Sequence, residues 1–220
     1  MVDDVSVLAG VDLFRALPPD ALALVAAAAS TRSLQRGDVL FSEGDDATTL
    51  FVVEQGRIAI ANRSLDGRES VVALMESGDL FGEMSLFDGQ GRSAEARALE
   101  PSRVCEVPFA PLRDVLQRRP ELLWGIVGLL ARRLRSMDAT LADAVFLDVT
   151  GRTAKRLLDI AGGADDFVLP ITQEELAGLV GASRERVNKA ISSFIRLGWI
   201  DQRERRYRIL NREQLALRAR

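Results

Sequence analysis

Residues 34–108 alternate between short apolar runs and turn residues. The runs cover residues 39–41, 50–53, 58–60 and 71–74. The glycines between them recur at intervals of 7, 12, 11 and 11 residues, at Gly37, Gly44, Gly56, Gly67 and Gly78. Short strands at regular spacing with glycine corners predict an antiparallel β-roll or barrel. The Asp66-Gly67 pair predicts a hairpin, and an Ala-rich helix at residues 21–29 precedes the strands.

From Pro120 the apolar spacing becomes that of a long helix. Proline suits a first helical turn, and apolar residues then recur every three or four positions over three heptads. We call this stripe the seam; its members are Leu123, Val127, Leu130, Leu134, Met137, Leu141 and Ala144. A second stripe, which would face the roll, consists of Leu122, Ile126, Leu129 and Val145. Two apolar stripes indicate a homodimer through the 123–144 seam, whereas a helix packed only on its own domain is the simpler alternative.

The long helix should end near Phe146-Leu147-Asp148, a segment that we interpret as a hinge between domains. Asp148 has the right side chain to cap the N-terminus of a following helix. Gly162-Gly163 would end that helix.

Residues 172–197 have the pattern of a helix-turn-helix. Thr172 and Glu175 frame a capping box, Gly181 interrupts the helix that follows, and Ser183 caps a second helix through Leu197. The polar residues at the start of this second helix are Arg184, Glu185, Arg186, Asn188 and Lys189. Arginine and lysine can bind guanine and glutamate can accept from cytosine, at the helix end that meets base edges in such motifs. A solvated charged face is the alternative.

Two short strands are predicted after this motif, at residues 199–200 and 207–210. They enclose a basic turn with Arg203, Arg205 and Arg206, which we interpret as a wing. A helix-turn-helix followed by a basic wing predicts binding to double-stranded DNA.

Residues 81–96 combine glycines with anion-binding side chains. Glycine allows close backbone approach, and a short helix beginning near Glu83 would aim N–H groups at an anion. Arg92 offers a fixed cation and Ser93 a hydroxyl donor, while the Glu83 carboxylate suits a ribose hydroxyl. A phosphate beside a sugar hydroxyl describes a nucleotide. The alternative is a glycine-rich corner with a structural arginine.

Composition narrows the function classes. The 220 residues are 47% apolar and 28% charged, with one cysteine, Cys105, and no histidine. This excludes a disulfide framework, clustered-cysteine zinc or iron–sulfur sites, serine-triad chemistry and imidazole-ligated haem, so we expect neither an enzyme nor a metalloprotein. The net charge of −3 divides into −8 for residues 1–150 and +5 for residues 151–220. The basic third suits a polyanion partner. No leader or membrane-spanning run is evident, so we expect a cytoplasmic protein.

Across nearly its whole length the sequence resembles CRP/FNR-type bacterial transcription regulators, particularly the cAMP-responsive subgroup. The matching blocks are residues 81–94, 146–152 and 180–185. The resemblance implies an α+β architecture in three parts. These are a cyclic-nucleotide-binding β-roll at residues 1–119, a long dimerisation helix at 120–147 and a winged helix-turn-helix at 148–220.

The resemblance also implies roles for individual residues. Gly82 and Glu83 would hold the ribose of cAMP, and Arg92 and Ser93 its cyclic phosphate. The full implied ligand-binding set is Gly82, Glu83, Met84, Arg92, Ser93, Ala94, Arg133, Met137 and Asp138. Arg184, Glu185 and Lys189 would read bases in a pseudo-palindromic site, and Thr172, Gln173 and Ser183 would hold phosphates. The full implied DNA-binding set adds Arg186, Asn188, Arg203 and Arg205. RNA polymerase is a further expected partner.

Two departures from the subgroup leave alternatives open. Lys189 replaces an arginine, which affects the half-site. Met137-Asp138 replaces a Thr-Ser pair that contacts the adenine amine. In a parallel dimer, Asp138 would pair with Arg133 of the partner subunit. Alternatively, its carboxylate accepts from a purine edge, where guanine is the better donor, so cGMP is a second candidate ligand. Within the same family, a regulator that binds DNA independently of cyclic nucleotide is the nearest rival; a protein-docking module is a rival from another class.

Overall fold

The computed structural model describes residues 4–63 and 69–220. The chain forms two compact units, Met1–Arg63 with Val72–Leu134 and Ser64–Val71 with Arg135–Arg220. Their division falls inside the long helix α6 (Leu123–Phe146). The boundaries expected after residues 119 and 147 stay predictions, and the Asp66-Gly67 hairpin lies outside the described residues.

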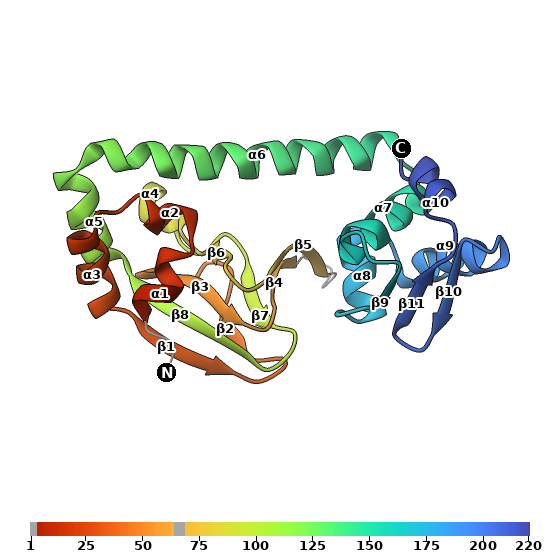
Figure 1. Ribbon diagram of the computed structural model, residues 1–220, viewed down its shortest axis with the longest axis horizontal. Coiled ribbons are helices and arrows are strands. Elements are labelled where there is room, and N and C mark those ends of the chain that lie inside the picture. Colours follow the sequence, from red (N-terminus) through yellow and green to blue (C-terminus); the bar gives the residue numbers. More distant parts are fainter. Residues whose placement is uncertain (1–3, 64–68) are drawn as a thin grey trace. The chain divides into compact units, whose positions relative to one another are not determined.

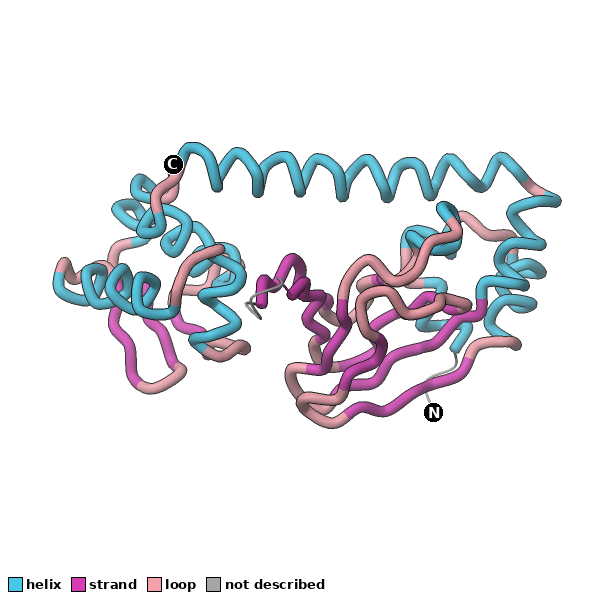
Figure 2. Tube along the Cα trace, turned by 180° about the vertical axis from the view of Figure 1, so that it is seen from behind, coloured by secondary structure: helices cyan, strands magenta, loops and turns pink. Residues whose placement is uncertain are grey.

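The strands of the first unit form a β-roll of two four-stranded sheets (Figure 1). Their orders are β1-β8-β3-β6 and β2-β7-β4-β5, with antiparallel pairing of β3 to β8 and of β4 to β7. The strands are β1 (Ser30–Leu34), β2 (Val39–Phe41), β3 (Thr49–Gln55), β4 (Ile58–Arg63), β5 (Glu69–Met75), β6 (Leu80–Phe81), β7 (Glu95–Ala98) and β8 (Ser102–Pro108). All four predicted apolar runs lie in β2 to β5, and the roll is confirmed. Figure 2 shows the same strands from behind.

Besides the helix α4 (Met84–Asp88), five short helical segments and the start of α6 complete the first unit. They are α1 (Asp4–Ala9), α2 (Asp12–Arg15), α3 (Pro19–Ala27), α5 (Phe109–Arg118) and the 3-10 turn η1 (Pro120–Leu122). The Ala-rich helix is therefore confirmed, displaced by two residues. Phe14 of α2, Leu112 of α5 and Ile126 of α6 share one core with residues of the sheet β1-β8-β3-β6. Burial of these apolar side chains holds the first turns of α6 on the roll.

Burial along α6 separates the two predicted stripes. Ile126 is 3% exposed, and Leu122 and Leu129 pack against the same core, as predicted for the second stripe. Its fourth member, Val145, is 68% exposed, so that assignment is wrong. Val145 falls in the second unit, where the nearest buried residue along the chain is Val149.

The second unit contains the predicted helix-turn-helix and wing. Its elements are α7 (Val149–Ala161), β9 (Asp166–Val168), α8 (Gln173–Val180), α9 (Arg184–Arg196), β10 (Ile200–Arg203), β11 (Arg206–Ile209) and α10 (Arg212–Arg218). Asp148, Thr172 and Ser183 cap α7, α8 and α9, as predicted. The strands form one sheet of order β10-β11-β9. Strand β9 and helix α10 were not predicted.

The described residues include neither a membrane-spanning helix nor a cluster of metal-binding side chains. None of their helices is long and apolar enough to cross a membrane. No group of three or more acidic, cysteine or histidine side chains among residues 4–63 and 69–220 has an arrangement that would hold a metal ion.

Candidate functional site

The segment between β6 and β7 carries the candidate anion-binding residues. Gly82 follows β6 directly, and the short helix α4 (Met84–Asp88) begins after Glu83, as predicted. The backbone of Gly82 has a φ of 75°, a conformation that favours glycine. A Cβ here would lie 2.6 Å from a terminal nitrogen of Arg92 and 3.3 Å from the Phe51 ring. Glycine is therefore required for Arg92 to approach the chain at this point.

Arg92 is fixed by its own backbone and by its guanidinium. Its N–H donates to the carbonyl of Asp45 (2.9 Å), and its carbonyl accepts from Gly44 N–H (2.8 Å). Nη1 donates to the carbonyl of Gly82 (2.8 Å), and Nη2 donates to the carbonyl of Thr49 (2.7 Å). These four bonds hold a buried positive charge in one orientation.

The Arg92 side chain is nearly enclosed, with the residue 5% exposed. Burial lowers the pKa of its guanidinium, and the nearby carboxylates of Glu106, Asp45 and Glu83 partly oppose that effect. Its Nε is buried without a hydrogen-bond partner. Pairing with an anion therefore lowers the free energy of this poorly hydrated cation more than it would that of a solvated arginine.

Glu83 is fully buried and bound to α6. Arg133 donates from Nη1 to Glu83 Oε1 and from Nη2 to the carbonyl of Leu80, so one guanidinium joins α6 to both β6 and the loop after it. The second carboxylate oxygen, Oε2, is buried without a partner. Arg133 thus has partners within its own chain, and its pairing with Asp138 of the partner subunit stays a prediction.

Glu83 Oε2 and Arg92 Nε are an unused acceptor and an unused donor in the same loop segment. Unpaired buried polar atoms are rare in folded proteins because each forgoes its hydration. A ligand with a hydroxyl donor and an anionic oxygen would supply partners for both. The donor set therefore fits a sugar phosphate.

The remaining predicted ligand residues differ in their surroundings. Ser93 is exposed, and its hydroxyl contacts the Met84 sulfur (3.7 Å), while Ala94 is buried. Met137 and Asp138 are exposed and belong to the second unit. The structure therefore brings together the cassette residues and Arg133 but not Met137 and Asp138, and the ligand-binding roles of all of them stay predictions.

Three residues at the Arg92 side chain, Thr49, Phe41 and Phe51, were not predicted. Thr49 accepts through its carbonyl, and its hydroxyl oxygen lies 3.3 Å from Nη2. The guanidinium carbon lies 4.2 Å from the centroid of the Phe41 ring and 5.3 Å from that of Phe51. Thr49 and Phe51 lie in β3 and Phe41 lies in β2, far from residue 92 in the sequence. The spacing of apolar residues therefore could not predict these contacts.

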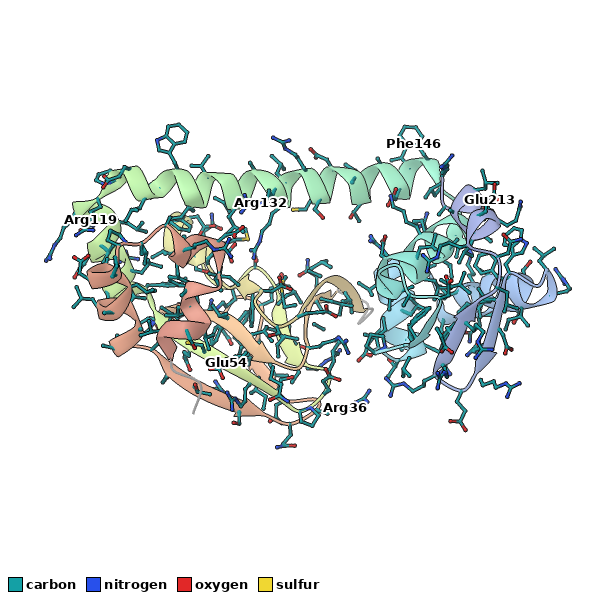
Figure 3. All side chains as sticks on the ribbon, in the orientation of Figure 1. Arg36, Glu54, Arg119, Arg132, Phe146 and Glu213 are labelled. Atoms are coloured by element: carbon teal, nitrogen blue, oxygen red, sulfur yellow. The ribbon has the colours of Figure 1, made fainter. Side chains whose placement is uncertain are left out.

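The seam of α6 is exposed along its whole length. Its large members are between 37% and 67% exposed: Leu123, Val127, Leu130, Leu134, Met137 and Leu141. Contiguous exposed apolar side chains at heptad spacing are typical of a helix that packs on another helix. Figure 3 shows Phe146 pointing away from α6, whereas Arg132 points toward the helices of the roll and pairs with Asp12 (2.9 Å).

The helix-turn-helix presents the predicted base-reading residues to solvent. Val187, Ala190, Ile191 and Phe194 form the buried face of α9. The opposite side begins with Arg184, Glu185, Arg186 and Lys189, all exposed, while Asn188 is half-buried. The cap hydroxyls of Thr172 and Ser183 accept from backbone N–H groups, which leaves each O–H free to donate to a phosphate.

The wing holds the predicted arginines at its tip. Strand β10 ends at Arg203 and β11 begins at Arg206, so the turn between them is Glu204-Arg205. Arg203 is exposed and lies 3.7 Å from Asp201, and Arg205 donates to the carbonyl of Leu169 (3.1 Å).

Gln173 has a different environment from the one expected of a phosphate contact. Its Nε2 donates to the hydroxyl of Tyr207 (2.5 Å), and its Oε1 is buried without a partner. The side chain thereby joins α8 to β11. Its phosphate role stays a prediction.

Comparison with known proteins bears on both units. Residues 31–119 match the model of the cyclic nucleotide-binding domain, and residues 151–218 match the Crp-like helix-turn-helix domain. A CRP-like cAMP-activated global transcriptional regulator of Mycobacterium tuberculosis is 38% identical over 97% of this chain and 99% of its own length. The chain belongs to the CRP/FNR family of transcription regulators.

Solved structures of CRP/FNR proteins agree with this assignment. The catabolite activator protein of Thermus thermophilus is 30% identical, with a TM-score of 0.53 over 94% of this chain and 98% of that one. The c-di-GMP responsive global regulator CLP of Xanthomonas campestris is 26% identical, with a TM-score of 0.76 over 87% and 99%. As a member of this family, the chain is a DNA-binding transcription regulator with a cyclic nucleotide-binding domain, not an enzyme.

Proposed function

We propose that this regulator is a homodimer whose binding to DNA is controlled by a cyclic nucleotide, with cAMP as the ligand. The single observation that carries the ligand proposal is the pair of unused buried atoms, Glu83 Oε2 and Arg92 Nε. The cAMP-activated description of the M. tuberculosis relative supports the choice of nucleotide.

In this proposal Glu83 accepts a hydrogen bond from the ribose, and Arg92 and Ser93 bind the cyclic phosphate. Gly82, Met84 and Ala94 shape the pocket through the backbone. Arg133 would then connect the ligand site to α6, because it lies on α6 and already donates a hydrogen bond to Glu83. Control requires that the ligand bind one dimer geometry more tightly than the other.

The seam of α6 would pair with the same seam of a second chain. Two copies related by a two-fold axis present two α9 helices, one helical turn of DNA apart, to a pseudo-palindromic site. In each copy Arg184, Glu185, Asn188 and Lys189 would read base edges, with Arg186 beside them. Thr172, Gln173, Ser183, Arg203 and Arg205 would contact phosphates. We also propose that the regulator contacts RNA polymerase and acts in the cytoplasm.

Calorimetric titration of the full chain with cAMP and with cGMP tests the ligand. We expect saturable heat with cAMP, and loss of that heat in Arg92→Ala with the dimer intact. Dissociation of Arg92→Ala into monomers would count against a ligand role for Arg92. Absence of heat with both nucleotides in the wild-type protein would refute cyclic mononucleotide control.

A second candidate is a regulator that binds DNA without a cyclic mononucleotide or senses another effector. The Met137-Asp138 pair favours it, because Met137 stands at one of the two positions that the resemblance places against the adenine amine, and a thioether is a poor hydrogen-bonding partner. The similar Xanthomonas protein is described as c-di-GMP responsive. A third titration with c-di-GMP, together with DNA binding measured without any nucleotide, distinguishes the two candidates.

A further inference from the structure

Asp148, which ends the segment that we predict to be a hinge, is held from two sides. Its carboxylate accepts from Gly151 N–H (2.8 Å), which is the cap of α7. Both carboxylate oxygens also accept from Nη2 of Arg218, in the last turn of α10. The Arg218 side chain is 33% exposed and the Asp148 side chain 61% exposed, so the pair lies at the surface and water screens its charges.

Helix α10 reaches the hinge because it packs along α7, as Figures 1 and 2 show. Leu215 is fully buried and anchors α10 there. Gly151 leaves room for the end of α10: a Cβ at this position would lie 3.0 Å from both Nη1 and the carbonyl oxygen of Arg218. Asp148, Gly151 and Arg218 therefore all meet at the N-terminus of α7.

The same stretch of α7 is connected to the helix-turn-helix. Arg152 donates from Nη1 to the carbonyl of Leu147 (2.7 Å) and from Nε to that of Val180 (2.8 Å), at the C-terminus of α8. Residues 147 and 148 are thus bonded to the turn that precedes α9 and to α10. A shift at the hinge would have to break or carry along both sets of bonds.

We propose that Arg218 is a positioning residue that clamps α10 onto the hinge and thereby biases the orientation of the DNA-reading helix. In this proposal the clamp acts through Asp148 and contacts neither DNA nor nucleotide. An electrostatic clamp is suited to this task, because one charged hydrogen-bonded pair biases a two-state hinge without locking it.

Hydrogen exchange of the backbone amides at residues 147–152 tests the clamp in the nucleotide-free full chain. Arg218→Gln should raise the exchange rate there by about three- to fivefold, a range typical of a partly exposed ion pair. Asp148→Asn should produce the same rise, because asparagine still caps a helix but loses the charge. The double variant should exchange no faster than either single variant.

Arg212→Gln is the matched control, because Arg212 lies on the same helix but bonds Asp165 and the carbonyl of Ala164. We expect unchanged exchange at 147–152 in this variant. Additive effects of the two clamp variants, or an equal rise in Arg212→Gln, would overturn the proposal. So would unchanged exchange in Arg218→Gln.

The functional readout rests on the proposed ligand control. The ratio of DNA affinities with and without cAMP should change by about three- to fivefold in Arg218→Gln and stay at the wild-type value in Arg212→Gln. An equal loss of affinity under both conditions would make Arg218 a DNA contact and overturn the positioning role. If wild-type binding ignores every nucleotide, ligand control fails, and the exchange experiment still decides the clamp.

Discussion

The guanidinium carbon of Arg92 lies 4.2 Å from the centroid of the Phe41 ring, so a buried cation rests on an aromatic face. The Phe41 ring also lies beside that of Phe51, with centroids 5.6 Å apart. Cation–π attraction is strongest where water is excluded, as it is around this arginine. Phe41 therefore holds the guanidinium that we propose as the phosphate ligand.

The first prediction concerns this contact. Phe41→Leu should weaken cyclic nucleotide binding by about tenfold, because a desolvated cation–π contact is worth about 1 to 2 kcal/mol. Phe41→Trp, which keeps an aromatic face, should retain more affinity than the leucine variant. Calorimetric titration measures both variants. Equal affinity of the leucine and tryptophan variants would show that the ring has no electrostatic role.

The second prediction concerns Gly82. Gly82→Ala places a Cβ 2.6 Å from Arg92 in a backbone with positive φ. Gly78→Ala is the matched control, because Gly78 also has positive φ but no heavy atom within 4 Å of the added Cβ. We expect Gly82→Ala to lower the unfolding free energy by at least about 1 kcal/mol more than Gly78→Ala in a denaturant titration. Equal losses would mean that Arg92 moves away at little cost.

Local chemistry explains which parts of the fold were predictable. The caps at Asp148 and Thr172 involve residues three apart, so the sequence itself displays both partners. Strands β6 and β9, of two and three residues, are too short to show a period. They could be found only through their pairing with β3 and β11.

Contacts across long sequence separations explain what was missed in the site. Glu83 and Arg133 are 50 positions apart, and Asp148 and Arg218 are 70 apart. Residue type predicted that Glu83 and Arg92 bind polar groups, but it carried no information on which of their atoms the fold leaves unpaired. Val145 was misassigned because helical periodicity continues past the last turn that a core covers.

The third prediction concerns the seam. Leu141→Glu places a charge on a side chain that is 65% exposed in one chain and would be buried between two. We expect the dimer dissociation constant to rise by at least about tenfold, because each copy loses the burial of a leucine. Leu24→Glu, at an equally exposed apolar position on α3, should leave the dimer unchanged. Sedimentation equilibrium measures both; a wild-type monomer would refute the homodimer.

The fourth prediction separates base reading from phosphate binding. Arg184→Ala should cost about 1–3 kcal/mol at one base pair and relax the preference there. Arg203→Ala, in the wing, should weaken all sequences alike and reduce the slope of log affinity against log salt by about 1. Binding to a library of single-base operator variants at several salt concentrations measures both effects. A uniform loss in Arg184→Ala would assign Arg184 to a phosphate.

The fifth prediction concerns Tyr207, the one tyrosine of the chain. Burial raises the pKa of its hydroxyl above the usual value of 10, while hydrogen bonds with Gln173 and Gln202 oppose the rise. A raised pKa means that the folded state favours the protonated phenol. The stability that it contributes is therefore present below pH 10 and is lost as the pH rises through the folded-state value.

Tyr207→Phe isolates this contribution. At pH 7 the variant should be less stable by about 1–3 kcal/mol, because the buried amide of Gln173 loses its hydroxyl partner. Above pH 10 the wild-type protein should lose stability relative to the variant, so the difference between them shrinks. Denaturant titrations at a series of pH values measure the difference, and the phenolate absorbance of the single tyrosine reports the pKa directly. A constant difference across this range would mean that Tyr207 titrates alike in the folded and unfolded chains.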